Sequence, residues 1–339
     1  MPNPILVEVT RGNLVESIHR GAAAVADAAG MLVASLGDVE TPIYPRSALK
    51  PIQAMPLLES GAAGAFSLSD EEVALACASH SGEPMHTTRV AAWLKRIGCS
   101  VDDLSCGPHE LRDPATIAAM NARHEKPTPL HNNCSGKHTG FLTLARHLGA
   151  PIAGYVDIDH PVQRAAARTL QDMAGLSGDL PWGVDGCTAP NFAVPLAALA
   201  RALARFADPS NLPLERAAAA RRIMRAMTAC PELVAGTGRV CTALMREAPG
   251  RLVVKTGAEG VFVAVLLDRG VAVALKIDDG ATRASETAIA AVLVGLRALP
   301  DAGPARALSH APIRNTRNAI VGERRPSKAL TQLAFGGGV

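Results

Sequence analysis

Three apolar segments late in the chain constrain the fold more than any other feature of the sequence. They are RLVV from Arg251, VFVAVLLD from Val261 and VAVALKID from Val271. Each contains a continuous apolar run, and turns that contain glycine separate them, the second being Asp268-Arg269-Gly270. The pattern predicts three buried strands joined as an antiparallel meander.

The beginning of the chain predicts a second group of strands. Short β-type segments lie at Val7 to Val9, Val15 to Arg20 and Met31 to Ala34, with turns between them. Strands at both ends of a chain, with helices in between, favour an α+β fold in which the terminal segments share one antiparallel sheet flanked by helices. We therefore expect residues 1–339 to form a single chain unit, with two intimate subdomains that share the terminal-segment sheet as the alternative.

Helix signals fill the rest of the sequence. Ser69 and Glu72 have the spacing of a capping box, and an aspartate of Asp157-Ile-Asp159-His160-Pro161 is expected to cap another helix. The predicted helices cover residues 69–78, 84–97, 161–173, 193–206, 214–228 and 282–298.

Composition and charge narrow the classes of function. The net charge of +3 is thinly spread, and we expect its one compact basic cluster, Arg324, Arg325 and Lys328, to be a solvated tail and not a nucleic-acid surface. The longest apolar runs are far below the roughly 18 residues that span a bilayer, and no export signal is evident. The seven scattered cysteines favour reduced thiols over a disulfide framework. We expect a cytoplasmic protein without nucleic-acid or membrane partners.

A serine and a lysine three residues apart can share one helical turn, and Ser47 and Lys50 have this spacing. An unprotonated amine placed there can take the hydroxyl proton while the serine attacks a carbonyl. Alone, the pattern favours an ordinary helix start, because S-x-x-K occurs by chance in many chains. Pro51 requires that any helix here carries a proline in its first turn.

Two later segments favour a serine acyl-transfer site. Penicillin-recognising hydrolases combine S-x-x-K, S-D-N and K-T-G in this chain order. Lys255-Thr256-Gly257 directly follows a predicted strand, which is the context that the last motif requires. The middle match is weak, since Ser79 is followed by His80 and Ser81 in place of Asp and Asn.

The decapeptide HNNCSGKHTG, from His131 to Gly140, gathers polar chemistry in an otherwise apolar chain. A phosphate-binding P-loop is excluded, because histidine occupies two positions that its motif assigns to Gly and to Ser or Thr. Cys134 and Lys137, with Cys187 of the segment GVDGCTAPN, lie in predicted polar loops and could bind zinc. The lysine would have to lose its proton, so spacing alone favours unrelated free thiols.

Seven segments together carry a family resemblance: YPRSALKPIQAMPLLESGA, CASHSGE, CGPH, HNNCSGKHTGFL, GYVDIDHPVQ, GVDGCTAPNFAVPL and KTGAEG. They resemble the L-asparaginase II family of the Rhizobium etli type over about residues 5–300. The resemblance implies a fold similar to that of serine β-lactamases and glutaminases. It also implies hydrolysis of L-asparagine to L-aspartate and ammonia by a cytoplasmic homodimer.

The resemblance further assigns catalytic roles. Ser47 with Lys50 and Ser79 with Lys255 would be two catalytic Ser–Lys pairs that make and hydrolyse a serine acyl-enzyme. Which serine is the nucleophile stays open, because each has an amine partner. A zinc ion, not required for the covalent step, would be held by Cys134, Lys137 and Cys187.

The charged groups of the substrate suggest further candidates. Arg46 is the cation nearest in sequence for the α-carboxylate, and Asp185 or Glu259 could take the α-ammonium. Backbone N–H groups near the first serine and around Gly257 could form an oxyanion hole. The predicted substrate-binding residues are Arg46, His80, Asp185, Gly257 and Glu259.

Two alternatives remain at this point. A glutaminase or a broader amidase fits the same residues, because one methylene in a pocket changes selectivity by only about 1–3 kcal/mol. A non-catalytic sensor that binds asparagine or zinc would use the same pocket without turnover. A penicillin-binding enzyme is less favoured, since such enzymes act outside the cytoplasm.

Overall fold

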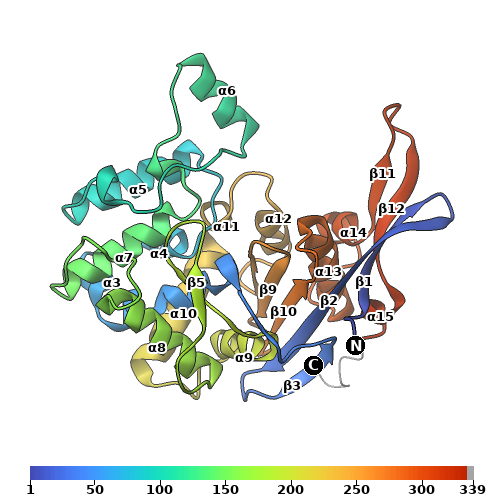
Figure 1. Ribbon diagram of the computed structural model, residues 1–339, viewed down its shortest axis with the longest axis horizontal. Helices are drawn as coiled ribbons and strands as arrows, with labels where there is room; N and C mark the ends of the chain where they lie inside the picture. Colours follow the sequence, from blue (N-terminus) through green and yellow to red (C-terminus); the bar gives the residue numbers. More distant parts are fainter. Residues whose placement is uncertain (334–339) are drawn as a thin grey trace. The chain divides into compact units, whose positions relative to one another are not determined.

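The computed structural model describes residues 1–333, which divide into two compact units (Figure 1). Unit 1 contains Met1–Ala48, Val194–Asp208 and the described residues from Ala243 onward. Unit 2 contains Leu49–Ala193 and Pro209–Thr242. None of the helices within residues 1–333 is long and apolar enough to cross a lipid bilayer.

An antiparallel sheet of eight strands forms the centre of unit 1. The strand order is β11-β12-β1-β2-β10-β9-β8, and β3 pairs with β2. Strands from both ends of the chain therefore lie side by side, as the blue and red strands of Figure 1 show. The strands are β1 (Ile5–Arg11), β2 (Leu14–Asp27), β3 (Leu32–Leu36), β8 (Leu252–Thr256), β9 (Val261–Leu266), β10 (Val271–Ile277), β11 (Ala311–Arg314) and β12 (Ile320–Pro326).

Helices pack on this sheet because its central strands are apolar on both faces. Every residue of β9 is buried, and α9 (Leu196–Ala207) and α13 (Thr282–Gly295) both contact β9 and β10. The predicted α+β class, an antiparallel sheet flanked by helices, is confirmed. The remaining elements of unit 1 are β4 (Pro42–Ile43), β7 (Val194–Pro195), α14 (Gly303–Ser309) and α15 (Lys328–Thr331).

Unit 2 is mainly helical. Its only sheet among the described residues pairs β5 (Trp182–Val184) with β6 (Pro190–Phe192). Its helices are α1 (Lys50–Gln53), α2 (Met55–Glu59), α3 (Ala62–Ala65), α4 (Asp70–Ala76), α5 (Pro84–Arg96), α6 (Pro114–Ala122), α7 (Ser135–His147), α8 (Pro161–Ala174), α10 (Leu214–Ala229) and α11 (Pro231–Val234); α12 (Val240–Glu247) begins in unit 2 and ends in unit 1.

The helix starts show where local chemistry decides the structure. Ser69 caps α4, and the reciprocal bonds with Glu72 form the predicted capping box. The predicted aspartate cap of α8 is wrong: His160 occupies the cap, and its Nδ1 accepts from the Val162 N–H at 3.2 Å. An imidazole nitrogen supplies the acceptor that the aspartate was expected to supply.

The decapeptide is not the polar loop that we expected. From Ser135 onward it forms the start of α7, and every residue from Ser135 to Ala145 is buried. Its glycines explain this, because α7 packs against α4 so closely that a Cβ on Gly136 would lie 2.3 Å from the Leu75 carbonyl oxygen. The small residues of the segment permit a tight helix crossing.

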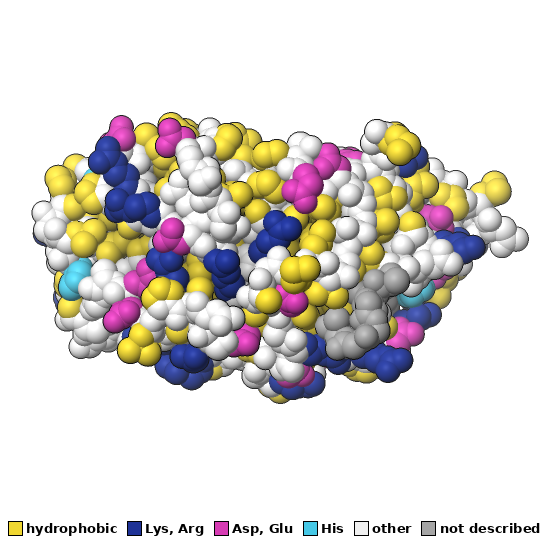
Figure 2. Space-filling model, turned by 90° about the horizontal axis from the view of Figure 1, so that it is seen from below, with side chains coloured by type: hydrophobic (Ala, Val, Ile, Leu, Met, Phe, Trp, Pro, Cys, Tyr) yellow, Lys and Arg dark blue, Asp and Glu magenta, His cyan; other side chains and the backbone are white. Residues whose placement is uncertain are grey.

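The basic cluster near the C-terminus is not a solvated tail either. Arg324 and Arg325 belong to β12, inside the sheet. Arg324 Nε donates to Thr287 Oγ1 at 2.6 Å, and Arg325 Nη2 pairs with Glu8 Oε2 at 3.1 Å. On the face drawn in Figure 2, basic and acidic side chains are interspersed.

Candidate active site

Lys50 is the most deeply buried of the predicted catalytic groups in unit 2. It opens α1, with Pro51 in the first turn as the sequence required, and only 1% of the residue is exposed. Its Nζ donates to Ser79 Oγ at 3.0 Å, to Asn133 O at 3.4 Å and to Ala78 O. A lysine nitrogen has three donor positions when protonated, and these acceptors match that number. The amine is held directly on a serine hydroxyl.

Ser79 is placed by the end of α4, three residues beyond the last residue of that helix. Its N–H donates to Val234 O at 2.9 Å, and the next N–H, of His80, donates to Asn133 O at 3.3 Å. The segment is thereby tied to α11 and to the start of α7. The side chain is buried, with 5% of the residue exposed. The arrangement lets a serine and an amine exchange a proton without bulk water.

His80 has a defined tautomer. The Gly82 N–H donates to its Nδ1 at 3.2 Å, so its Nε2 carries the proton and donates to Ser135 Oγ at 3.0 Å. Both ring nitrogens are thus used within the chain, and a contact with substrate stays a prediction. Burial, and then the charges of His86 and Lys50, lower the pKa of His80 well below its ordinary value. The ring stacks on His86 with centroids 4.7 Å apart.

Cys134, Lys137 and Cys187 meet in unit 2 as a buried cluster of sulfur and nitrogen. Lys137 Nζ lies 3.0 Å from Cys187 Sγ. The Cys134 side chain, together with the Lys137 charge, lowers the pKa of Cys187 strongly in spite of burial. The Cys134 thiol itself donates to Asn133 Oδ1 at 3.2 Å. Cys187 and burial raise the pKa of Cys134, and the two sulfurs outweigh burial and raise the pKa of Lys137. These shifts favour the charged forms of Cys187 and Lys137 and the neutral form of Cys134.

These donors fit a zinc ion by their chemistry. Two sulfurs and one nitrogen are ligands that zinc prefers, and three protein ligands leave a fourth position open. The fit depends on the lysine: within residues 1–333, no three His, Cys, Asp or Glu side chains gather as a cation site. Metal binding would require loss of the Lys137 and Cys134 protons.

In unit 1, the segment that contains Lys255 and Gly257 lies against the segment that contains Ser47. Lys255 lies on β8 with 1% of the residue exposed, and its Nζ donates to Thr256 O at 3.0 Å. A Cβ on Gly257 would lie 2.6 Å from the oxygen of Pro45, two residues before Ser47. The K-T-G segment therefore packs against the segment that carries Ser47.

Gly257 has no free N–H to offer an oxyanion in this conformation. Its N–H already donates to Val261 O at 2.8 Å. Glycine is required at position 257 for another reason: without a side chain, the backbone can approach Pro45 closely.

Backbone strain lies next to several predicted site residues. Arg46, Thr188 and Glu259 have φ values of +54°, +71° and +57°, in the left-handed region that side chains rarely adopt. Arg46 precedes Ser47, and Thr188 follows Cys187. Arg46 and Glu259 are themselves predicted substrate-binding residues. Strained residues of this kind cluster at functional sites.

The remaining predicted residue, Asp185, is half-buried in the turn before Cys187. Its Oδ1 accepts from the Gly186 N–H at 2.8 Å, and its backbone oxygen accepts from the Thr188 N–H at 2.8 Å.

The sequence interpretation missed three residues of the site. Asn133 supplies a carbonyl that accepts from Lys50, and His138 and Tyr155 lie next to the sulfur cluster. The spacing of four between Cys134 and His138 could have indicated the histidine, but only once a helix was expected there.

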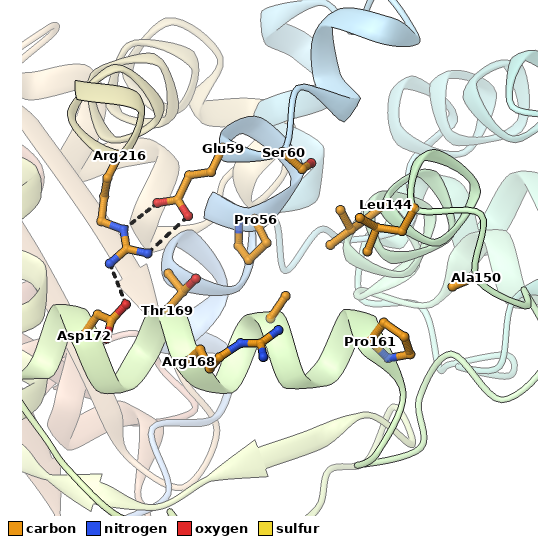
Figure 3. A pocket seen from close by; sticks show the side chains of 12 residues that line it. Pro56, Glu59, Ser60, Leu144, Ala150, Pro161, Arg168, Thr169, Asp172 and Arg216 are labelled. Atoms are coloured by element: carbon orange, nitrogen blue, oxygen red, sulfur yellow. Dashed lines mark hydrogen bonds and ion pairs between the residues drawn. The ribbon is translucent and has the colours of Figure 1, made fainter. Parts of the chain in front are cut away.

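A separate hollow of about 660 Å³ opens elsewhere in unit 2, between α2, α7 and α8 (Figure 3). Arg216 bridges Glu59 at 2.7 Å and Asp172 at 2.9 Å on one side of it, and Arg168 lines it from α8. None of the predicted catalytic or metal-binding residues lines this hollow. It is not the candidate active site.

Comparisons with solved structures give distant similarities. Mglu, in its native form in 4.3 M NaCl, matches at TM-score 0.47 and 15% identity, covering 84% of this chain and 62% of that chain. A β-lactamase from Mycobacterium bovis matches at TM-score 0.42 and 15% identity, covering 82% and 95% of the two chains. A mutant class C β-lactamase matches at TM-score 0.40 and 14% identity, covering 78% and 89%. This chain thus spans about three-fifths of the length of Mglu.

The comparison with curated proteins gives no match. The family model described as L-asparaginase II matches residues 7–326, which is nearly the whole chain. Together with the α+β fold, this match places the protein among the amidohydrolases. The chain belongs to the L-asparaginase II family.

Proposed function

We propose that this protein hydrolyses L-asparagine to L-aspartate and ammonia through a serine acyl-enzyme. Membership of the L-asparaginase II family supports the reaction class. The observation that carries the mechanism is the contact of 3.0 Å between Lys50 Nζ and Ser79 Oγ, two groups that are almost fully buried. A buried amine in contact with a hydroxyl is the arrangement needed to activate a serine or to return its proton.

The chemical steps conserve every proton. Ser47 Oγ attacks the side-chain amide carbon, its proton passes to an amine of the Ser–Lys pairs, and the carbonyl oxygen becomes an oxyanion. The C–N bond then breaks as the same proton moves to the leaving nitrogen, which departs as ammonia. Water repeats the sequence on the aspartyl ester. Lys50 has to act as a free amine when it accepts the proton.

The Lys50–Ser79 contact adds a third Ser–Lys contact to the two expected pairs. The family resemblance couples Ser47 with Lys50 and Ser79 with Lys255, and this pairing stays a prediction. In the geometry of unit 2, Lys50 also reaches Ser79, so a proton taken by Lys50 can move on to Ser79. We propose that Ser79 relays protons between the two amines. If Ser79 is the nucleophile and Ser47 the relay, the same two serines and two amines still carry the proton.

The substrate-binding roles stay as the sequence suggested them. Arg46 takes the α-carboxylate, and Asp185 or Glu259 takes the α-ammonium. The strained backbone of Arg46 and Glu259 supports a functional role for both. The length of the pocket sets the selectivity for asparagine over glutamine. The two substrates differ by one methylene, and a methylene changes selectivity by about 1–3 kcal/mol.

Cys134, Lys137 and Cys187 would hold zinc beside this machinery. When bound, zinc supplies a Lewis acid that can orient a polar group of the substrate. The covalent step uses the serines and amines alone, so metal removal is expected to change substrate binding more than the acylation chemistry. A homodimer of the Rhizobium etli type in the cytoplasm is the proposed assembly and location.

Ammonia release from L-asparagine tests this proposal directly. Ser47→Ala, Ser79→Ala and Lys50→Met are each expected to lower kcat by about 10²–10⁴-fold, the usual contribution of a proton-transfer group. Ser285→Ala is the matched control, because Ser285 is also buried but lies on α13 and donates to Thr282 O. Its turnover should equal that of the wild type.

Three outcomes decide between the candidate functions. Faster turnover of L-glutamine than of L-asparagine would favour the glutaminase alternative. Binding of asparagine without ammonia release by the wild type would favour a sensor. Equal rates for the wild type and both serine variants would refute the mechanism.

A further inference from the structure

The segment that carries Ser79 has no regular structure of its own. Helix α4 ends at Ala76, and residues 78–83 form neither helix nor strand. Ser79 and Glu83 are nevertheless buried, with 5% and 6% of the residue exposed. Contacts with other segments of unit 2 must therefore keep the Ser79 hydroxyl at 3.0 Å from Lys50 Nζ.

The even-numbered residues of this segment face the residues at the start of α7. The His80 N–H donates to Asn133 O at 3.3 Å, and the His80 ring contacts Ser135 Oγ at 3.0 Å. A Cβ on Gly82 would lie 2.9 Å from His131 O. One side of the segment is thereby packed against α7 and the turn before it.

The odd-numbered residues face a second segment, residues 234–237, which we call the clasp. The Ser79 N–H donates to Val234 O at 2.9 Å. Two residues further on, Ser81 Oγ donates to Ala235 O at 3.2 Å. The clasp thus follows the segment from its catalytic serine onward.

Glu83 closes the contact at the far end of the segment. Its Oε1 accepts from the Thr237 N–H at 2.8 Å, and its Oε2 accepts from Thr237 Oγ1 at 2.7 Å. Its own N–H donates to His86 Nδ1 at 3.1 Å, in the first turn of α5. Glu83 therefore ties the Ser79 segment, the clasp and a helix start together through one buried side chain.

Gly236 lets the two segments approach each other. A Cβ at this position would lie 2.5 Å from Ser81 Oγ and 2.9 Å from Ser81 Cβ. Its φ of +129° also lies in a region that residues with side chains rarely adopt. The Gly236 carbonyl is fixed in turn, because Thr242 Oγ1 donates to it at 2.7 Å. Only glycine fits here without displacing the clasp.

We propose that Glu83 and Gly236 are positioning residues for Ser79: they hold residues 79–83 on the clasp and so keep the Ser79 hydroxyl in reach of Lys50 during proton transfer. The inference rests on the proposed relay role of Ser79. Neither residue has to touch the substrate. A displacement of about 1 Å at a reacting group can cost about 10²-fold in rate, so a small opening of the clasp is enough to slow turnover.

Hydrogen exchange of the full-length protein, followed by mass spectrometry of its peptides, tests the clasp without reference to activity. In Gly236→Ala the added Cβ separates the two segments, so the amides of residues 79–83 should exchange about tenfold faster. The amides of β9, whose residues are all buried, should keep the wild-type rate and show that the change is local. The matched control is Gly238→Ala: Gly238 also has a positive φ, +69°, but its added Cβ would meet nothing within 4 Å.

Kinetics of ammonia release supply the second readout. Glu83→Ala should lower kcat per folded molecule by about 10–100-fold, because Ser79 is misplaced for proton transfer. KM should not change, since the lost interaction acts in the chemical step. Glu83→Gln should recover most of the loss, because its amide can accept from the Thr237 N–H and donate to Thr237 Oγ1. Thr237→Val, which removes the hydroxyl contact at an exposed residue, should cause smaller changes in the same direction and keeps the test available if Gly236→Ala does not fold.

Each outcome decides the proposal. Equal exchange of residues 79–83 in Gly236→Ala and Gly238→Ala would overturn it, and so would a loss of kcat in Glu83→Ala that Glu83→Gln does not recover. If the wild type releases ammonia and the clasp variants lose exchange protection without losing kcat, the positioning role alone falls. If the wild type releases no ammonia, the hydrolase proposal falls and the relay role of Ser79 falls with it.

Discussion

At the scale of single residues, the site depends on polar groups held by backbone atoms and neighbouring side chains. Only its spacing from Ser47 marks Lys50 in the sequence, yet its amine is held by Ser79, Ala78 and Asn133. The sequence predicted that these residue types carry chemistry. It could not predict that Lys50 touches Ser79, because that contact joins positions 29 residues apart.

Burial of His80 makes stability depend on pH. The folded state holds this ring neutral, because its pKa is lowered well below the ordinary value of about 6.5 that it regains on unfolding. Below pH 6.5 the unfolded chain therefore binds more protons, and the free energy of unfolding falls as the pH falls. After burial itself, the groups that act in the same direction are His86, Lys50, His131 and His109.

Urea unfolding between pH 7 and pH 5 measures this effect. The wild type should lose about 1.4 kcal/mol more per pH unit below 6.5 than His80→Gln, which has no titrating ring. The comparison uses the slope with pH, so a constant difference in stability between the two proteins does not matter. Identical slopes would show that His80 is not held neutral.

At the scale of elements, helix α7 shows which structure the sequence could not predict, and its glycines explain why. Capping at Ser69 and the helix spanning 84–97 followed from local rules, and the structure has both. The helix at Ser135–His147 did not follow, because its first residues include Gly, Ser and Thr, which are weak helix formers. Its formation depends on a close crossing with α4, which is a tertiary contact.

Two glycines of α7 provide a matched pair for testing that crossing. Gly136→Ala places a Cβ 2.3 Å from Leu75 O and should destabilise the fold by about 1–3 kcal/mol, as overpacking usually does. At Gly140 the atom nearest to an added Cβ is Leu57 Cδ2, at 3.4 Å. Gly140→Ala should therefore be neutral or stabilising by up to about 1 kcal/mol through helix propensity.

Chemical denaturation of both variants decides the point. Equal stability changes for Gly136→Ala and Gly140→Ala would contradict the close helix crossing. Because Ser79 follows α4 and Asn133 precedes α7, Gly136→Ala should also reduce ammonia release more than Gly140→Ala does.

At the scale of the whole molecule, the sequence predicted the sheet better than the site. Strand-like segments and apolar runs at both ends of the chain predicted strands, and strands from the two ends do pair in one antiparallel sheet. Strands β11 and β12 were not predicted, and the basic residues of β12 suggested a solvated tail. Arg324 and Arg325 find their partners on other elements. Membership of the L-asparaginase II family gives the reaction class, and the substrate and the Ser–Lys relay are proposals.

The central claim is that a buried amine–hydroxyl relay makes and breaks an ester between the substrate and this chain. Mass spectrometry of protein quenched with acid during turnover of L-asparagine tests it most directly. We predict an aspartyl adduct on the peptide that contains Ser47 or on the peptide that contains Ser79, and a larger adduct population in Lys50→Met if deacylation slows more than acylation. Steady release of ammonia with neither peptide modified would contradict the account.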